Sequence, residues 1–163
     1  MSETSRPTPT VPIPLAYYCL IPHPAARQLL FLACGEEWTL PWWMHEGDDR
    51  PFWQTVDVVD RALRVRFGLD TPTLRCVHVA HDSQQGWIER VYECEPAPLT
   101  WTVSPGGHWF GQDDVERLLL AIPAHRALLD RWFAEAGDAA VARRPPGITP
   151  AGTPRRLTGS RPN

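Results

Sequence analysis

The chain has 163 residues, in which 16 Lys and Arg face 19 Asp and Glu for a formal net charge of -3. This length accommodates one domain, and the slightly acidic balance argues against a nucleic-acid or membrane partner, which usually requires a basic face. No apolar run approaches the roughly 18 residues that cross a bilayer. We therefore expect a cytoplasmic protein whose widely spaced cysteines are reduced.

The two ends of the chain differ in composition from its middle. Residues 1–14 are rich in Pro, Thr and Ser, and residues 138–163 are rich in Pro and Arg. Neither end carries enough large apolar side chains to offset the entropy lost on ordering. We expect a disordered leader over residues 1–14, a single domain over 15–137 and a disordered tail over 138–163.

Strand and helix patterns follow one another along residues 15–94. Residues 15–21 and 28–34 are apolar runs of strand length, predicted to form a hairpin or neighbouring strands. Residues 35–49 show no period and are predicted to be a loop. Apolar positions at helical spacing predict a helix over residues 51–67 that ends at Gly68. Residues 74–81 and 87–94 alternate and are predicted to pair as strands.

Three further elements are predicted in the last third of the chain. They are a short strand over residues 99–103, a helix over residues 112–122, and a second helix that begins at Pro123 and ends at Gly137. The order of elements predicts an α/β fold of the α+β type, a mixed β-sheet sandwiched between helices.

Residues 47–69, GDDRPFWQTVDVVDRALRVRFGL, have the spacing of a signature motif. The matching positions resemble the Nudix box of the Nudix hydrolases without a gap: Gly47, Arg61, Leu63, Gly68 and Leu69. Residues 38–41, WTLP, resemble the family's W-x-L-P lead-in, and residues 108–110 resemble its late aromatic segment. The resemblance spans roughly residues 15–136 and implies a Nudix-like fold.

The resemblance also implies a metal-dependent chemistry whose ligands are missing here. In the family, four box glutamates hold magnesium or manganese against a diphosphate, and here those positions are Trp53, Ala62, Val65 and Arg66. Such ions require oxygen ligands. We therefore expect no catalytic residue, no bound metal and no cofactor. Magnesium or manganese is expected only if other carboxylates replace the lost glutamates.

Several other carboxylates keep that replacement open. Asp57 and Asp60 are alternative catalytic residues, but each lies four residues before an arginine, so surface ion pairs with Arg61 and Arg64 are favoured. The remaining candidates are two loop carboxylates as metal ligands and one strand carboxylate as a catalytic group: Asp48, Asp49 and Glu89.

Two tryptophans stand where two glycines normally follow the W-x-L-P lead-in. Trp42 and Trp43 are expected to fill the former substrate cleft, with an exposed aromatic surface for a partner as the alternative. Together with Arg61 and Arg66 of the predicted helix, they are the candidate ligand- or partner-binding residues.

A run of thiol and imidazole groups lies on the strand predicted over residues 74–81. Strand alternation places Cys76 and His78 on one face and His81 on the other. No second cluster completes four zinc ligands, so a structural position is favoured for each of them.

Three functions from different classes remain. The favoured one is a Nudix-like domain that has lost pyrophosphohydrolase activity and acts as a ligand- or protein-binding regulatory module. The first alternative is a divergent, metal-dependent Nudix hydrolase cleaving a nucleoside diphosphate-linked substrate, and the second is a purely structural interaction domain. The expected partner is a small molecule or a protein, and a homodimer stays open.

Overall fold

The computed structural model describes residues 13–45 and 52–142, with side chains described for residues 13–45 and 56–137. The strands are β1 (Leu15–Leu20), β2 (Gln28–Cys34), β3 (Glu37–Thr39), β4 (Trp42–His45), β5 (Thr73–Asp82), β6 (Trp87–Cys94) and β7 (Gly107–Gly111). The helices are α1 (Phe52–Phe67), α2 (Gln112–Val115) and α3 (His125–Ala142).

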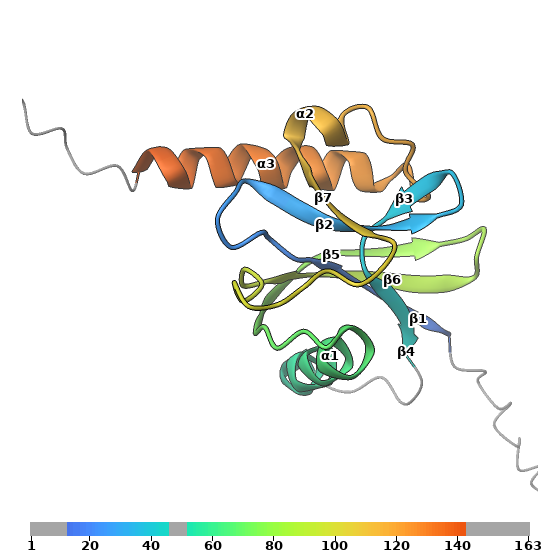
Figure 1. Ribbon diagram of the computed structural model, residues 1–163. Coiled ribbons are helices and arrows are strands. Elements are labelled where there is room, and N and C mark those ends of the chain that lie inside the picture. Colours follow the sequence, from blue (N-terminus) through green and yellow to red (C-terminus); the bar gives the residue numbers. More distant parts are fainter. Residues whose placement is uncertain (1–12, 46–51, 143–163) are drawn as a thin grey trace, which may run out of the picture.

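The strands form two sheets that lie between the long helices. One sheet has the order β4-β1-β6-β5 and is mixed, because β1 pairs parallel with β6 and antiparallel with β4. The other has the order β3-β2-β7 and is antiparallel. Helices α1 and α3 lie on opposite sides of these sheets (Figure 1). This arrangement confirms the predicted α+β class with a mixed sheet between helices.

Strand β1 is buried along its whole length and supplies both sides of the core. Its alternate residues Leu15, Tyr17 and Cys19 join the apolar cluster beneath α1. The residues between them, Ala16, Tyr18 and Leu20, join the cluster beneath α3. Successive strand side chains point to opposite faces, so one strand feeds two cores.

The predicted helix over residues 51–67 is confirmed as α1. Val59 and Leu63 are fully buried against the sheet, whereas Val65 is 78% exposed. Gly68 has a φ of 61°, a conformation that glycine adopts without steric cost, and its amide donates to the carbonyl of Arg64. The helix therefore ends where the box predicts.

The predictions for the first four strands need correction. β1 and β2 lie in different sheets, and only the residues that follow β1 pair with β2, through a bridge between Pro22 and Leu29 and a hydrogen bond from the amide of Leu30 to the carbonyl of Ile21. Both edges of β1 are already occupied by β4 and β6, so β2 has no place beside it. The predicted loop over residues 35–49 contains β3 and β4, two strands too short to show a period on either side of Pro41.

The C-terminal third also departs from the predictions, although β5 and β6 pair as expected. Residues 99–103 form no strand: the amide of Trp101 donates to the carbonyl of Pro98 in a turn, and its indole donates to the carbonyl of Phe67 at the end of α1. Helix α2 stops at Val115, and α3 begins at His125 rather than at Pro123. Helix α3 continues past Gly137, where the missing Cβ leaves room for the Arg27 guanidinium.

None of the helices described in residues 13–45 and 52–142 is long and apolar enough to cross a membrane.

Leu63 and Val65 provide a matched test of the packing of α1. We expect Leu63→Ala to lower the free energy of unfolding by about 2–5 kcal/mol, because it removes a fully buried side chain and leaves a cavity. Val65→Ala, two residues away and exposed, should change it by less than about 0.5 kcal/mol. Urea denaturation measures both values, and equal losses would contradict this orientation of the helix.

Candidate functional site

The positions of the box glutamates hold no metal ligand in the structure. Ala62 packs against the cluster beneath α1, and Val65 and Arg66 are exposed. Trp53 lies in the first turn of α1, where side chains are outside the described part. In the described residues, no group of three or more His, Cys, Asp or Glu side chains could hold a metal ion.

The alternative carboxylates on α1 do not form the expected ion pairs. Asp60 accepts hydrogen bonds from the amide of Thr73, at 2.9 Å, and from its hydroxyl, at 2.6 Å. Arg64 pairs instead with Asp70 at 2.8 Å, in an exposed ion pair. The prediction of an Asp60–Arg64 pair is therefore wrong, because Asp60 faces the start of β5 and fastens it to the helix.

The other expected pair, Asp57 with Arg61, is also absent. The structure describes both side chains, both are exposed, and no ion pair joins them. Exposed pairs at this spacing gain little, so the two side chains stay solvated. The proposed loop ligands Asp48 and Asp49 lie outside the described residues.

Trp42 and Trp43 lie on opposite faces of β4. Trp43 is 5% exposed in the cluster beneath α1, where its ring meets Tyr17 edge-on at 5.9 Å. Trp42 is 37% exposed on the α3 side and stacks on Tyr18 at 5.7 Å with an interplanar angle of 16°. One tryptophan has become core and the other borders open space.

That open space is a cavity of about 510 Å³ on the α3 side of the mixed sheet. Its floor and walls come from β1, β4 and β6, the turn between β5 and β6, and the connection from α2 to α3. The described lining residues with aromatic or titratable side chains are Tyr18, Cys34, Trp42, His81, Asp82, Trp87 and Glu89. The other described residues that line it are neutral.

A buried carboxylate lies at the base of this cavity. Glu89 of β6 is 3% exposed, and one of its oxygens lies 3.2 Å from Nε2 of His125 and 3.3 Å from Nε2 of His78. Burial alone would raise the pKa of Glu89, but the hydrogen bond and charge of His125 and the charge of His78 outweigh it and lower the pKa. An ionised carboxylate only accepts hydrogen bonds, so His125 donates through Nε2.

The negative charges of Glu89 and Asp82 affect the groups around the cavity. Burial raises the pKa of Tyr18 far above its usual range, and the negative charges of Glu89 and Asp82 add to this effect. Asp82 accepts hydrogen bonds from the amides of Gln84 and Gln85, at 2.9 and 3.0 Å, and so shapes the turn between β5 and β6. The indole nitrogen of Trp87 is buried and has no hydrogen-bond partner within the described residues.

The prediction that Cys76 and His78 share a face is wrong. Cys76 packs on the α1 side, whereas His78 reaches Glu89 on the α3 side. The pairing of β5 with β6 shifts register between these two residues, and such a bulge breaks the alternation of faces. His81, expected on the face opposite His78, lines the cavity.

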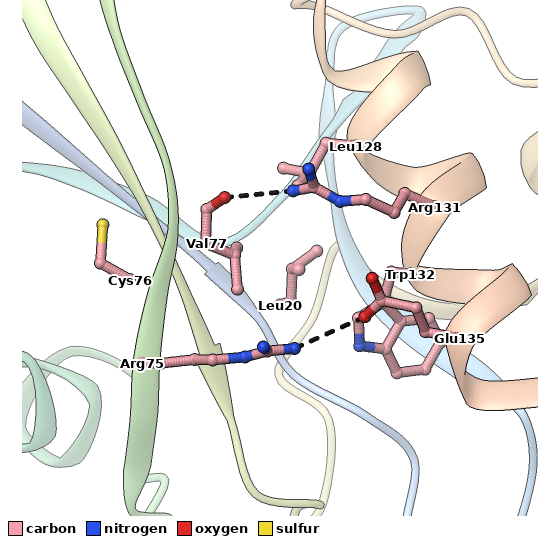
Figure 2. A pocket seen from close by; sticks show the side chains of 8 residues that line it. All are labelled: Leu20, Arg75, Cys76, Val77, Leu128, Arg131, Trp132 and Glu135. Atoms are coloured by element: carbon pink, nitrogen blue, oxygen red, sulfur yellow. Dashed lines mark hydrogen bonds and ion pairs between the residues drawn. The ribbon is translucent and has the colours of Figure 1, made fainter. Parts of the chain in front are cut away.

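A second cavity of about 270 Å³ separates β5 from α3, and its charged groups are already paired (Figure 2). Arg75 lies 2.7 Å from Glu93 and 3.5 Å from Glu135. Arg131 of α3 donates to the carbonyl of Val77 at 3.1 Å. Figure 2 shows these side chains reaching across the gap. These contacts tie α3 to the edge of the sheet.

Only some of the residues at the cavity were candidates from the sequence. Trp42 was a candidate and lines it, and Glu89 was an alternative carboxylate and lies at its base. Arg61 and Arg66 are exposed on α1 and do not border it. His125 was missed, because its only sequence signal is its place after Pro123, and its pairing with Glu89 depends on how α3 docks.

Comparison with known proteins rests on structure alone, since no family profile and no curated protein matches the sequence. A Nudix hydrolase from Nitrosomonas europaea aligns with a TM-score of 0.61 at 12% identity, covering 79% of this chain and 74% of that protein. The Ap4A hydrolase of C. elegans aligns with a TM-score of 0.59 at 16% identity, covering 76% of this chain and 98% of that one.

A further match is a putative oxidoreductase from Sinorhizobium meliloti, with a TM-score of 0.60 at 18% identity. The alignment covers 77% of this chain but only 40% of that longer protein. Identities this low carry the fold and no activity. Together with the sheet order and the helix that carries the box, these likenesses show that the chain has the fold of the Nudix hydrolases.

Proposed function

We propose that this chain is a Nudix-fold ligand-binding module that has lost metal-dependent pyrophosphohydrolase activity. The observation that carries the proposal is the set of side chains at the box positions: a core-packed Ala62, an exposed Val65 and an exposed Arg66. Magnesium and manganese need several oxygen ligands at close range, and these side chains supply none.

The other carboxylates of the described part offer little replacement. Asp60 is engaged by Thr73, and Asp57 is exposed on α1. Glu89 has two imidazoles at the same oxygen, which serves a structural ion pair better than a hydrated cation. A divergent hydrolase remains the alternative, because two of the structural neighbours are described as hydrolases and Asp48 and Asp49 lie outside the described residues.

The cavity supports binding as the remaining role. Its volume of about 510 Å³ lies within the range of roughly 300–1,000 Å³ that is typical of small-molecule pockets. Trp42 and Trp87 provide large, rigid aromatic walls, which lose little conformational entropy when a ligand packs against them. A pocket of this kind favours a small molecule over the purely structural role.

The loss of catalysis is tested with the purified full chain and a panel of nucleoside diphosphate derivatives, with magnesium or manganese added. We expect no phosphate or nucleoside monophosphate above the rate of the metal-containing buffer, because the box supplies no oxygen ligand. Chromatography of the reaction products measures the outcome.

The Asp57→Asn, Asp60→Asn double variant and a separate Asp48→Asn, Asp49→Asn variant are the controls for this assay. Asparagine keeps the size of each side chain and retains a hydrogen-bond acceptor for Thr73. Turnover by the parent chain that either variant abolishes would overturn the proposal in favour of the hydrolase.

The structural role of Glu89 has a pH signature. The pKa of Glu89 is lower in the folded protein than in the unfolded chain, where it is about 4.3. Its carboxylate therefore stabilises the fold above about pH 4.3, and this stabilisation is lost as the pH falls through the folded pKa. We expect Glu89→Gln to lower the free energy of unfolding at pH 7 by about 1–3 kcal/mol. The difference from the parent chain should shrink below about pH 4.3 in denaturation experiments.

Asp57→Asn is the control for this measurement, because it removes an exposed carboxylate from the opposite side of the sheets. It should leave stability nearly unchanged at both pH values. A Glu89→Gln deficit as large at pH 3 as at pH 7 would show that packing rather than charge holds this site together.

A further inference from the structure

We propose that the 510 Å³ cavity binds a small organic cation, such as a quaternary ammonium compound, by holding it against the indole rings of Trp42 and Trp87 and beside the carboxylate of Asp82, with Glu89 at the base. This inference rests on the proposed function, since it assumes that the cavity takes a ligand. It identifies the chemical class of that ligand from the groups that surround the space.

The carboxylates around the cavity favour a positively charged ligand. Two carboxylates, Asp82 and Glu89, line it, and no Lys or Arg is found among its described lining residues. A diphosphate placed there would meet Asp82 and, at the base, Glu89, with no Lys or Arg to offset the repulsion and with His78 and His125 already held by Glu89. The same carboxylates attract a positive charge.

The cavity also has an accessible aromatic surface. Trp42 is 37% exposed at the cavity and therefore accessible, and its ring lies 6.0 Å from that of Trp87 at an interplanar angle of 42°. Rings tilted in this way do not cover one another as stacked rings do. The faces of tryptophan carry the negative side of the ring quadrupole, which makes indole the strongest aromatic partner for a cation.

Of the two carboxylates, Asp82 is held in place without a basic side chain as its partner, whereas Glu89 is paired with two imidazoles. Asp82 is fixed by the amides of Gln84 and Gln85. Glu89 is fixed by imidazoles, and His125 itself packs edge-on against Tyr18 at 4.9 Å. Backbone hydrogen bonds orient Asp82 and leave its negative charge available to a ligand, while Glu89 adds a partly offset charge at the base of the cavity.

The neutral rim fits the same class of ligand. The turn between β5 and β6 contributes Ser83, Gln84 and Gln85, and the connection from α2 to α3 contributes residues 121–124. Hydroxyl and amide groups can bind an alcohol or ester oxygen attached to the ammonium head. The cavity therefore suits a cationic head with a short polar substituent.

Choline and its uncharged isostere 3,3-dimethylbutan-1-ol provide the direct test. They have the same shape and differ only in the charge on the central atom, so their comparison isolates the cationic contribution. We expect choline to bind about tenfold more tightly, as measured by ligand-detected NMR titration of the full chain in low-salt buffer.

Three variants locate the binding. Asp82→Asn keeps the acceptor for the turn and removes one charge, so it should weaken choline by about three- to tenfold and leave the isostere unchanged. Trp42→Ala should weaken both compounds, with its fold checked by circular dichroism. Asp57→Asn removes the same charge from α1 and should change neither, because that helix lies across the sheets from the cavity (Figure 1).

The possible failures can be distinguished from failure of the proposed function. Equal binding of choline and the isostere would overturn the cation inference and leave the binding module in place. Choline binding that is unaffected by both cavity variants, or no binding of either compound at about 10 mM, would also overturn the inference. Metal-dependent turnover in the separate hydrolysis assay would instead remove the proposed function.

Discussion

The arrangement of the molecule depends on the complete burial of β1. All six of its residues are buried, and both of its edges are paired, with β4 on one side and β6 on the other. The adjacent residues Tyr17 and Tyr18 consequently pack in opposite layers, one beneath α1 and the other beneath α3. A shift of β1 by one residue relative to β4 and β6 would move each of its side chains to the opposite layer. Because both faces of β1 are buried, its register is strongly specified.

The same alternation determines what the two tryptophans of β4 do. Because Trp43 opposes Tyr17, it lies in the α1 layer and completes the core. Trp42 opposes Tyr18, lies in the α3 layer and forms a wall of the cavity. Trp42 and Trp43 stand where the family that the sequence resembles has two glycines. Trp43 therefore fills space in the core on one side of the sheet, and Trp42 lines the cavity on the other.

The sequence predicted elements whose signals are local. The period of residues 51–67, Gly68 as a helix end and the alternation of β6 were sufficient for α1 and for the pairing of β5 with β6. The strands β3 and β4 escaped, because three or four residues cannot establish a period. The register shift in β5 also escaped, and it reversed the face expected for His78 relative to Cys76.

The core of the candidate site lay beyond sequence reasoning for a different reason. Glu89 and His125 are 36 residues apart and belong to a strand and a helix whose contact depends on the docking of α3. Glu89 and Glu93 are four residues apart in β6, but the structure gives them different roles. Glu93 accepts from Arg75 and Trp132 near the sheet edge, while Glu89 meets two histidines at the cavity.

The proposed loss of the metal site and the charge of the cavity are physically connected. A bound divalent cation allows negatively charged groups of a protein to approach a diphosphate, because the cation offsets the repulsion between them. With Ala62, Val65 and Arg66 at the box positions, that offset is missing on α1. The proposed cation site follows the same logic, because the carboxylates at the cavity disfavour an anionic ligand that no metal accompanies. The two proposals, a box without metal ligands and a cavity for a cation, therefore rest on the same electrostatic rule.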